Sequence, residues 1–314
     1  MRFLFEVIMY DGGVYRSAEL YEAIEDVGGT VLHFNRSAQM LTVTMSVPEE
    51  DRGVIEKISK EIGGEIRSVP LAGTEIAVVG CTLGRHHMPH PICDIAEVLR
   101  ESGSISVVMG IARGRGKNTS QISKKELEII NEYDAVIFML GNFKSCVETK
   151  RFLLEDITVP VVLVCGPQPD GMDDICEAIV PGVGRKAERM RLPDEREKLR
   201  EISSVIIDVI HNKKRMLEED PLFIHPAELK ILLENYEPID MCLRPAPIVL
   251  HLDGLRVKIP YREHKEYFDN LDVYGRKLSE IAEITESKMA DNSTLIRIKT
   301  KSQVEDMDSR AGSE

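Results

Sequence analysis

The chain has 314 residues, of which 43% are hydrophobic and 30% charged, and its formal net charge is −13 at pH 7. This length predicts two or three domains, each with its own core. The acidic balance argues against general binding to nucleic acid or to an anionic membrane, and an aromatic content of 5% argues against a protein that stacks on bases. No apolar run approaches the roughly 20 residues that span a bilayer, and the first residues lack a signal-peptide cleavage region, so we expect a cytoplasmic protein. The six cysteines are then expected to be reduced thiols or metal ligands.

The first segment, residues 1–70, predicts a ferredoxin-like domain. Strand-like and helical patterns follow one another there in the order βαββαβ. The clearest strand is at residues 41–47, where apolar residues alternate with Thr and Ser. Because this fold serves many functions, the order alone does not indicate one.

The hydrophobic pattern changes in residues 71–190, and it predicts a flavodoxin-like, or more generally Rossmann-like, α/β domain. Short, continuous apolar runs alternate with helical patterns, which is typical of a parallel sheet covered on both faces. The runs that we expect to be strands are Glu75–Gly80, Ile105–Met109, Ala135–Leu140 and Val161–Val164.

The remainder predicts a mostly helical region over 191–290, followed by a polar and partly disordered tail over 291–314. Residues 194–217 form a long amphipathic pattern. A β-hairpin is expected within 248–259, because two apolar runs flank an Asp-Gly turn. A further helix is expected over 271–284.

The strongest chemical signal lies directly after the first strand of the parallel sheet. Two cysteines, Cys81 and Cys93, bracket His86, His87 and His90, although the whole chain has only eight histidines. Sulfur and imidazole donors at this density suit a transition metal or an iron–sulfur cluster. The histidines could also contact solvent or a partner, or act as acids and bases, and these alternatives stay open.

Topology extends this signal to other parts of the chain. In an open parallel sheet, ligands bind beyond the carboxyl ends of the strands. Cys81 and Cys165 each follow a predicted strand, and Cys146 follows the turn after another. We therefore expect these donors to lie along one edge of the sheet, near Cys93, although Cys165 taken alone is more typical of packing. The spacing matches no zinc pattern, because the chain has no CxxC pair.

A glycine-rich basic segment, residues 110–118, follows the second strand of this sheet. It carries Arg113, Arg115 and Lys117 among three glycines. Such a segment can bind an anion through backbone N–H groups and positive charge, or it can dock on an acidic partner. It is not a Walker A loop, because its glycine spacing differs and Asn118 stands where Ser or Thr would bind the metal.

Three motifs together resemble the methanogenesis marker protein 7 family, over most of the chain. They are the segments Gly84–Ile95, Leu140–Lys150 and Pro160–Cys165. The middle domain is also similar to the operon-encoded C protein of methyl-coenzyme M reductase. The positions shared with that family are Gly84, Arg85, His87, Pro91, Cys93, Gly141, Asn142 and Lys150. At the position of Cys146 the C protein has His, which is also a metal donor.

The resemblance implies a component of the ATP-driven machinery that reductively activates methyl-coenzyme M reductase in methanogenic archaea. It implies an iron–sulfur cluster, related to precursors of the nitrogenase cofactor, that is held for electron transfer at a subunit interface. The implied partners are methyl-coenzyme M reductase, its operon protein C, other methanogenesis marker proteins and an ATP-binding component. We expect neither nucleic acid nor membrane among the partners, and an assembly or electron-transfer role in place of catalysis.

The expected roles follow from these motifs, and no catalytic residue is assigned. The expected metal ligands are, in order of preference, Cys93, His87, Cys146, Cys81, His86 and His90. The residues expected to contact the cofactor or to neutralise its charge are Gly84, Arg85, Asn142, Arg113, Arg115 and Lys117. Two alternatives remain, namely a flavin- or nucleotide-binding oxidoreductase and a metal-free scaffold subunit of the same complex.

Overall fold

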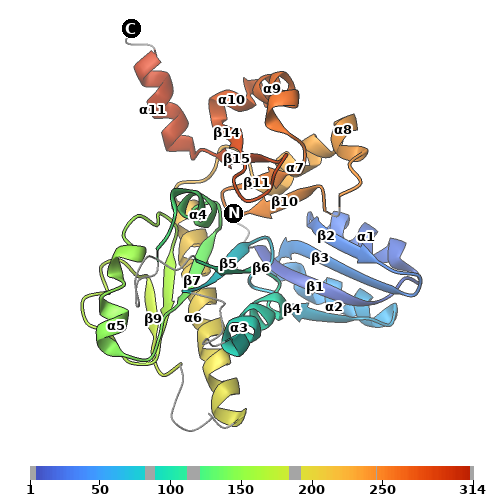
Figure 1. Ribbon diagram of the computed structural model, residues 1–314. Helices are drawn as coiled ribbons and strands as arrows, with labels where there is room; N and C mark the ends of the chain where they lie inside the picture. Colours follow the sequence, from blue (N-terminus) through green and yellow to red (C-terminus); the bar gives the residue numbers. More distant parts are fainter. Residues whose placement is uncertain (1–4, 82–88, 112–120, 184–191, 245, 312–314) are drawn as a thin grey trace. The chain divides into compact units, whose positions relative to one another are not determined.

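The computed structural model describes residues 5–81, 89–111, 121–183, 192–244 and 246–311 (Figure 1). The chain forms two compact units, one of residues 1–73 with 101–104 and one of the remaining residues. Both units are mixed α/β structures.

The first unit is an antiparallel sheet with two helices. Its elements are β1 (Phe5–Gly13), α1 (Ser17–Asp26), β2 (Thr30–Arg36), β3 (Met40–Pro48), the 3₁₀ turn η1 (Glu49–Asp51), α2 (Arg52–Glu61) and β4 (Glu65–Ser68). This is the predicted order βαββαβ, and the strands are arranged β2-β3-β1-β4. The alternating pattern of β3 places Val43 and Met45 in a core with Leu20 of α1 and Ile55 of α2, all of them fully buried.

The second unit contains a five-stranded parallel sheet in the order β6-β5-β7-β8-β9. Its strands are β5 (Glu75–Gly80), β6 (Ile105–Gly110), β7 (Ala135–Met139), β8 (Val161–Val164) and β9 (Ala178–Val180). Its helices are α3 (Pro89–Glu101), α4 (Lys124–Ile130), α5 (Lys144–Glu148), the 3₁₀ turn η2 (Arg151–Leu153) and α6 (Leu192–Glu219). The four predicted strands are therefore present. Numbered along the chain, the order is 2-1-3-4-5, so the direction of winding reverses between β5 and β7.

Helix α6 is the predicted amphipathic helix, and it is 28 residues long. Ile202, Ile206 and Ile210 lie at helical spacing on its buried stripe, and the helix contacts β8 and β9. Within the described residues, no helix is long and apolar enough to cross a membrane.

The rest of this unit contains more sheet than the sequence predicted. The expected hairpin is present as β10 (Ile248–His251) and β11 (Gly254–Val257), but it belongs to a four-stranded antiparallel sheet in the order β10-β11-β15-β14. The elements around this sheet are α7 (Pro226–Glu234), α8 (Glu237–Asp240), α9 (Tyr261–Asn270), β12 (Asp272–Val273), β13 (Arg276–Lys277) and α10 (Leu278–Ile281). The last elements are β14 (Ala282–Glu286), β15 (Thr294–Ile298) and α11 (Lys301–Ala311).

Two expectations for this region differ from the structure. The helix expected over 271–284 is replaced by the β12–β13 turn, the short α10 and strand β14, because Tyr274 and Gly275 have positive φ angles of 53° and 83°, which a helix cannot accommodate. The polar tail expected after Asp291 contains β15, an inner strand of the sheet, and the helix α11.

Candidate functional site

The candidate site lies at the carboxyl edge of the parallel sheet, where β5 and β7 are neighbours. Gly80 and Met139, the last residues of these strands, are paired in register. Cys81 directly follows β5; its side chain is half-buried and packs against the core formed with α4 and α5. The sequence therefore continues from an apolar, fully buried strand into a sulfur donor at the sheet edge.

Cys93 lies in the first half of α3 and its side chain is exposed. The preceding residue, Ile92, is buried and holds the helix close to the end of β5. A Cβ atom added at Gly80 would lie 2.6 Å from Ile92 Cδ1, so the Ile92 side chain occupies the space next to Gly80. Cys93 is thus fixed in place by its neighbour and remains accessible to a ligand.

Cys146 lies on the short helix α5 and is half-buried. The Lys150 ammonium donates a hydrogen bond to Cys146 Sγ over 3.0 Å. Metals bind sulfur as the thiolate, and this contact places a positive charge next to the sulfur atom. Lys150 is also one of the positions that carry the family resemblance.

The helices that carry Cys93 and Cys146 cover opposite faces of the sheet. Ala77 and Val79 of β5 belong to a core that includes Val147 of α5. Successive strand residues point to opposite faces, so Gly80 faces the other side, where Ile92 of α3 lies. Cys93 and Cys146 therefore approach the carboxyl edge from two sides, and they do not share one face.

Asn142 lies in the turn after β7, close to the end of β8. Gly166 N donates to Gly141 O over 3.2 Å, and a Cβ atom at Gly166 would lie 2.9 Å from Asn142 Cα. This turn is therefore packed tightly against the next strand end. Asn142 is thus held at the edge where the cofactor contact was predicted.

Two other cysteines are structural. Cys165, at the end of β8, is completely buried, and its thiol donates to Pro167 O over 3.1 Å. Burial raises the pKa of Cys165 to about 11 and that of Cys176, mainly for the same reason, to about 12. Both remain neutral thiols near neutral pH, which agrees with the packing role expected for Cys165.

Several predicted site residues lie outside the described residues, and they stay predictions. They are Gly84, Arg85, His86, His87, Arg113, Arg115 and Lys117. His90 falls within α3, where only its backbone is described. Within the described part of the chain, no group of three or more His, Cys, Asp or Glu side chains is placed to hold a metal ion.

The opposite, amino edge of the parallel sheet carries a buried charge cluster that the sequence analysis did not identify. Glu75 begins β5, and its carboxylate lies 2.6 Å from Arg256 Nη1 and 3.2 Å from His251 Nε2. His251 Nδ1 lies 3.6 Å from the Asp134 carboxylate, and all four side chains are buried. Burial raises the pKa of Glu75, but the contacts with His251 and Arg256 outweigh this effect and hold the pKa below its usual value.

This cluster joins the parallel sheet to the antiparallel sheet. Asp134 accepts hydrogen bonds from the backbone N–H groups of Glu75 (2.7 Å) and Leu252 (2.8 Å). The buried carboxylate of Glu132 accepts from the Ser287 hydroxyl (2.7 Å) and from the backbone N–H of Lys288. The cluster is therefore a structural junction, and its members are too far apart in sequence to form a local motif.

Comparisons with known proteins agree with the resemblance in the motifs. The sequence profile of the family described as methyl-coenzyme M reductase operon protein C matches residues 5–271, which is more than the middle domain. A Methanocaldococcus jannaschii protein named Uncharacterized protein MJ0094 is 38% identical over 303 residues, 96% of either chain. The methyl-coenzyme M reductase operon protein C of Methanococcus voltae is 30% identical over 113 residues, which are 33% of this chain and 62% of the relative.

Among solved structures, the flavoenzyme FerB of Paracoccus denitrificans matches 44% of this chain and 98% of its own, at 8% identity. Its TM-score of 0.27 is too low to bear on fold or function. The profile match covers most of both units, and the donor motifs occur within it. The chain thus belongs to the methyl-coenzyme M reductase operon protein C family.

Proposed function

We propose that this protein is a subunit of the ATP-dependent complex that reductively activates methyl-coenzyme M reductase, and that it holds an iron–sulfur cluster for electron transfer. Membership of the operon protein C family supports the link to this enzyme, because relatives carry its name. The two strand orders, β2-β3-β1-β4 and β6-β5-β7-β8-β9, support a ferredoxin-like and a flavodoxin-like domain.

The observation that carries the proposal is the set of thiols at the carboxyl edge. Cys81, Cys93 and Cys146 form no disulfide, and each follows or flanks the end of β5 or β7, which are adjacent strands. Thiolates are the ligands that iron–sulfur clusters require, and a cluster at a subunit interface needs few donors from each chain. Because Cys93 and Cys146 approach this edge from opposite faces of the sheet, a cluster that both residues bind would lie beyond the strand ends, with His87 as a further ligand.

When bound, the cluster would supply a site that accepts and releases single electrons. The protein's own contribution is to place Cys93 at an accessible position and to set a positive charge, Lys150, beside Cys146. Positive charge next to a cluster raises its reduction potential. The basic residues of the 110–118 segment would also raise the reduction potential of the cluster, or they would bind the neighbouring subunit.

Iron analysis of anaerobically purified protein, alone and with its partners, tests this proposal. The Cys93→Ala and Cys146→Ala variants should lose bound iron and the visible absorption of the cluster, while Cys165→Ala should keep both, because Cys165 is a buried neutral thiol. Circular dichroism would establish that each variant is folded. Iron content that is unchanged in both Cys93→Ala and Cys146→Ala would contradict the assignment.

A metal-free scaffold subunit is the second candidate. It is favoured by the positions of Cys93 and Cys146, which approach the carboxyl edge from opposite faces of the sheet. Metal-free protein that still assembles with its partners and supports activation of the reductase would establish this alternative.

A further inference from the structure

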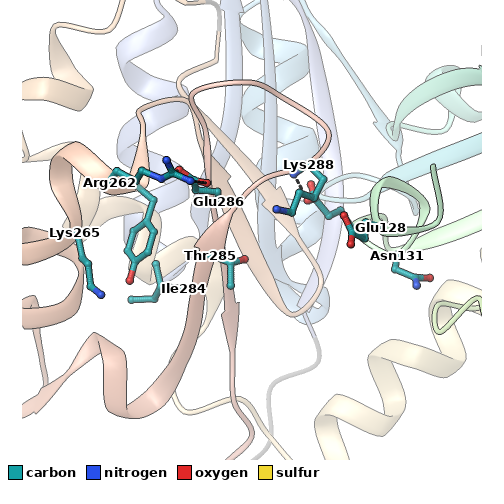
Figure 2. A pocket seen from close by; sticks show the side chains of 10 residues that line it. Glu128, Asn131, Arg262, Lys265, Ile284, Thr285, Glu286 and Lys288 are labelled. Carbon is teal, nitrogen blue, oxygen red and sulfur yellow. Dashed lines mark hydrogen bonds and ion pairs between the residues drawn. The ribbon is translucent and has the colours of Figure 1, made fainter. Parts of the chain in front are cut away.

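Lys150 differs from many other basic side chains of this protein in what it contacts. In the groove of Figure 2, Arg262 pairs with Glu286 over 2.7 Å, so a carboxylate neutralises the guanidinium. Close to Lys150 in the sequence, Lys144 pairs with Asp170 over 2.7 Å. Within the described residues Lys150 has no ion pair with a carboxylate, and its ammonium donates to a sulfur atom.

That sulfur belongs to Cys146, which lies on α5, and Lys150 follows the end of this helix. The backbone N–H of Lys150 donates to Val147 O over 3.0 Å, and the Thr149 hydroxyl donates to Cys146 O over 3.1 Å. Residues four apart on such a helical turn lie on the same face. The backbone therefore holds the two side chains together, with Lys150 Nζ 3.0 Å from Cys146 Sγ.

Both side chains are half-buried, so a small oxidant can reach the sulfur. Peroxide converts an accessible cysteine to sulfenic acid, whose sulfur condenses with a nearby thiol or nitrogen. Without such a partner, further oxidation gives sulfinic and sulfonic acids, which ordinary thiols do not reduce. The Lys150 nitrogen is already in contact with the Cys146 sulfur, and it is therefore placed to condense with it.

We propose that Cys146 and Lys150 form an oxidative modification site, at which hydrogen peroxide produces a sulfur–nitrogen cross-link, a sulfenamide. Peroxide oxidises the thiol to sulfenic acid and is itself reduced to water. The Lys150 nitrogen then attacks the sulfur, and the S–N bond forms as the S–O bond breaks. The ammonium loses two protons in this step, of which one joins the departing hydroxide to give water and the other is released.

The cross-link keeps the sulfur at an oxidation level that thiols can reverse. One thiol attacks the sulfur and releases the lysine amine, and a second thiol then releases Cys146 as the other product becomes a disulfide. While the cross-link lasts, Cys146 cannot bind a metal, so one donor of the candidate site is withheld. Its formation does not depend on whether a cluster binds at this site.

The test uses the full chain, treated with a chelator so that the sulfur is free of metal, and then with hydrogen peroxide. After alkylation with iodoacetamide, trypsin should release Ser145–Lys150 from protein that is not cross-linked. The cross-link blocks cleavage after Lys150, so we expect Ser145–Arg151 instead, lighter by two hydrogen atoms than its thiol form. Dithiothreitol before alkylation should restore the shorter peptide, and mass spectrometry identifies both.

Two lysine variants with the same type of substitution complete the test. Lys150→Arg keeps a positive charge near the sulfur, but a guanidinium is a poor nucleophile, so no cross-link should form. Cys146 in this variant should accumulate at least about threefold more sulfinic and sulfonic acid than in wild type. Lys144→Arg changes a lysine that pairs with Asp170, and it should form the cross-link as wild type does.

Three results would overturn the proposal. The first is wild-type Cys146 that is oxidised to sulfinic or sulfonic acid, or to a disulfide, without the cross-linked peptide. The second is a Cys146 thiol that stays unmodified while the exposed Cys93 is oxidised in the same sample. The third is equal irreversible oxidation of Cys146 in wild type and Lys150→Arg, because the amine would then have no effect.

Discussion

The two edges of the parallel sheet differ in the exposure of their polar side chains: those at the carboxyl edge are partly or fully exposed, and those at the amino edge are buried. At the carboxyl edge, Cys81, Cys93 and Cys146 are half-buried or exposed, and they stand on turns and helix starts. At the amino edge, Glu75 and Arg256 form a buried ion pair that also contacts His251. The thiols at the carboxyl edge remain accessible to a ligand. The charged side chains at the amino edge instead contact one another and join the parallel sheet to the antiparallel sheet.

This difference explains what could be read from the sequence. The donors between Cys81 and Cys93 are concentrated in one short segment, so their density identified them, and the predicted strand order identified Cys146. The members of the amino-edge cluster come from β5, β10 and β11 and from the residue before β7, and each is one charged residue in or beside an apolar run. Only the folded chain brings them together, and the one local signal was the unusual placement of charge within predicted strands.

The largest expected effect is at the amino edge. Arg256→Met should lower the free energy of unfolding by about 3–5 kcal/mol, because it leaves the buried Glu75 carboxylate without its cation. Urea unfolding at pH 7 measures this change. Arg16→Met is the control, since Arg16 pairs with Glu19 on the surface, and no measurable change is expected there.

Adding Glu75→Gln to Arg256→Met should recover part of the lost stability, because the uncompensated charge is removed. A loss below about 1 kcal/mol in the single variant would mean that the cluster does not stabilise the junction, and the contrast between the two edges would fail.

The next effect depends on pH. Burial raises the pKa of Asp253, but Arg297 and Lys213 outweigh it and hold the pKa below its usual value. A carboxylate with a lowered pKa stabilises the fold above its unfolded-state pKa of about 3.9, and this stability is lost as the pH falls through the folded-state value. Asp253→Asn should therefore be less stable than wild type by about 1–3 kcal/mol at pH 7, and the difference should shrink below about pH 4.

Urea midpoints at pH 7, 5 and 3 would measure this dependence. A difference between wild type and Asp253→Asn that stays constant over the whole range would show that the contact with Arg297 does not depend on the carboxylate charge.

Cysteine substitutions should separate the edge residues from the core. Cys165→Ala should cost about 1–2 kcal/mol, because a fully buried sulfur atom is lost from the core. Cys93→Ala should change stability by less than about 0.5 kcal/mol, because its side chain is exposed. Thermal unfolding of the two metal-free variants measures the difference. Equal losses of stability in Cys93→Ala and Cys165→Ala would mean that the Cys93 side chain is part of the core.

Thiol labelling probes the same contrast without any change in stability. Burial raises the pKa values of Cys165 and Cys176 to about 11 and about 12, so few thiolates form there at neutral pH. Iodoacetamide should label Cys93 in the folded protein and should reach Cys165 and Cys176 only after unfolding. Mass spectrometry of tryptic peptides would identify each site, and early labelling of Cys165 would contradict its burial.

The successes and failures of the fold prediction have a common physical origin. Largely apolar runs predicted β5, β6, β7 and β8, which is typical of a covered parallel sheet; β5, β7 and β8 are buried, while β6, at the edge of the sheet, is partly exposed. The residues of 271–284 have apolar side chains at helical spacing, yet they fold as turn, short helix and strand, because their pairing partner in β15 comes later in the chain. Tertiary pairing outweighed local periodicity there.

The candidate site shows the same limit. Sequence density pointed to the Cys81–Cys93 segment, and topology placed Cys146 after a neighbouring strand. Neither signal showed that α3 and α5 cover opposite faces of the sheet, because this depends on the alternation of side chains in β5. A ligand shared by Cys93 and Cys146 would have to reach around the end of the sheet.

The amino-edge cluster also limits how the protein can be divided for experiments. A fragment that ends before residue 220 would keep Glu75, Glu132 and Asp134 but lose both basic partners, His251 and Arg256. Three carboxylates would then face water or each other at the base of the sheet, and the fragment should aggregate or require acid to stay compact. Expression boundaries and limited proteolysis should therefore treat residues 74–311 as a single piece.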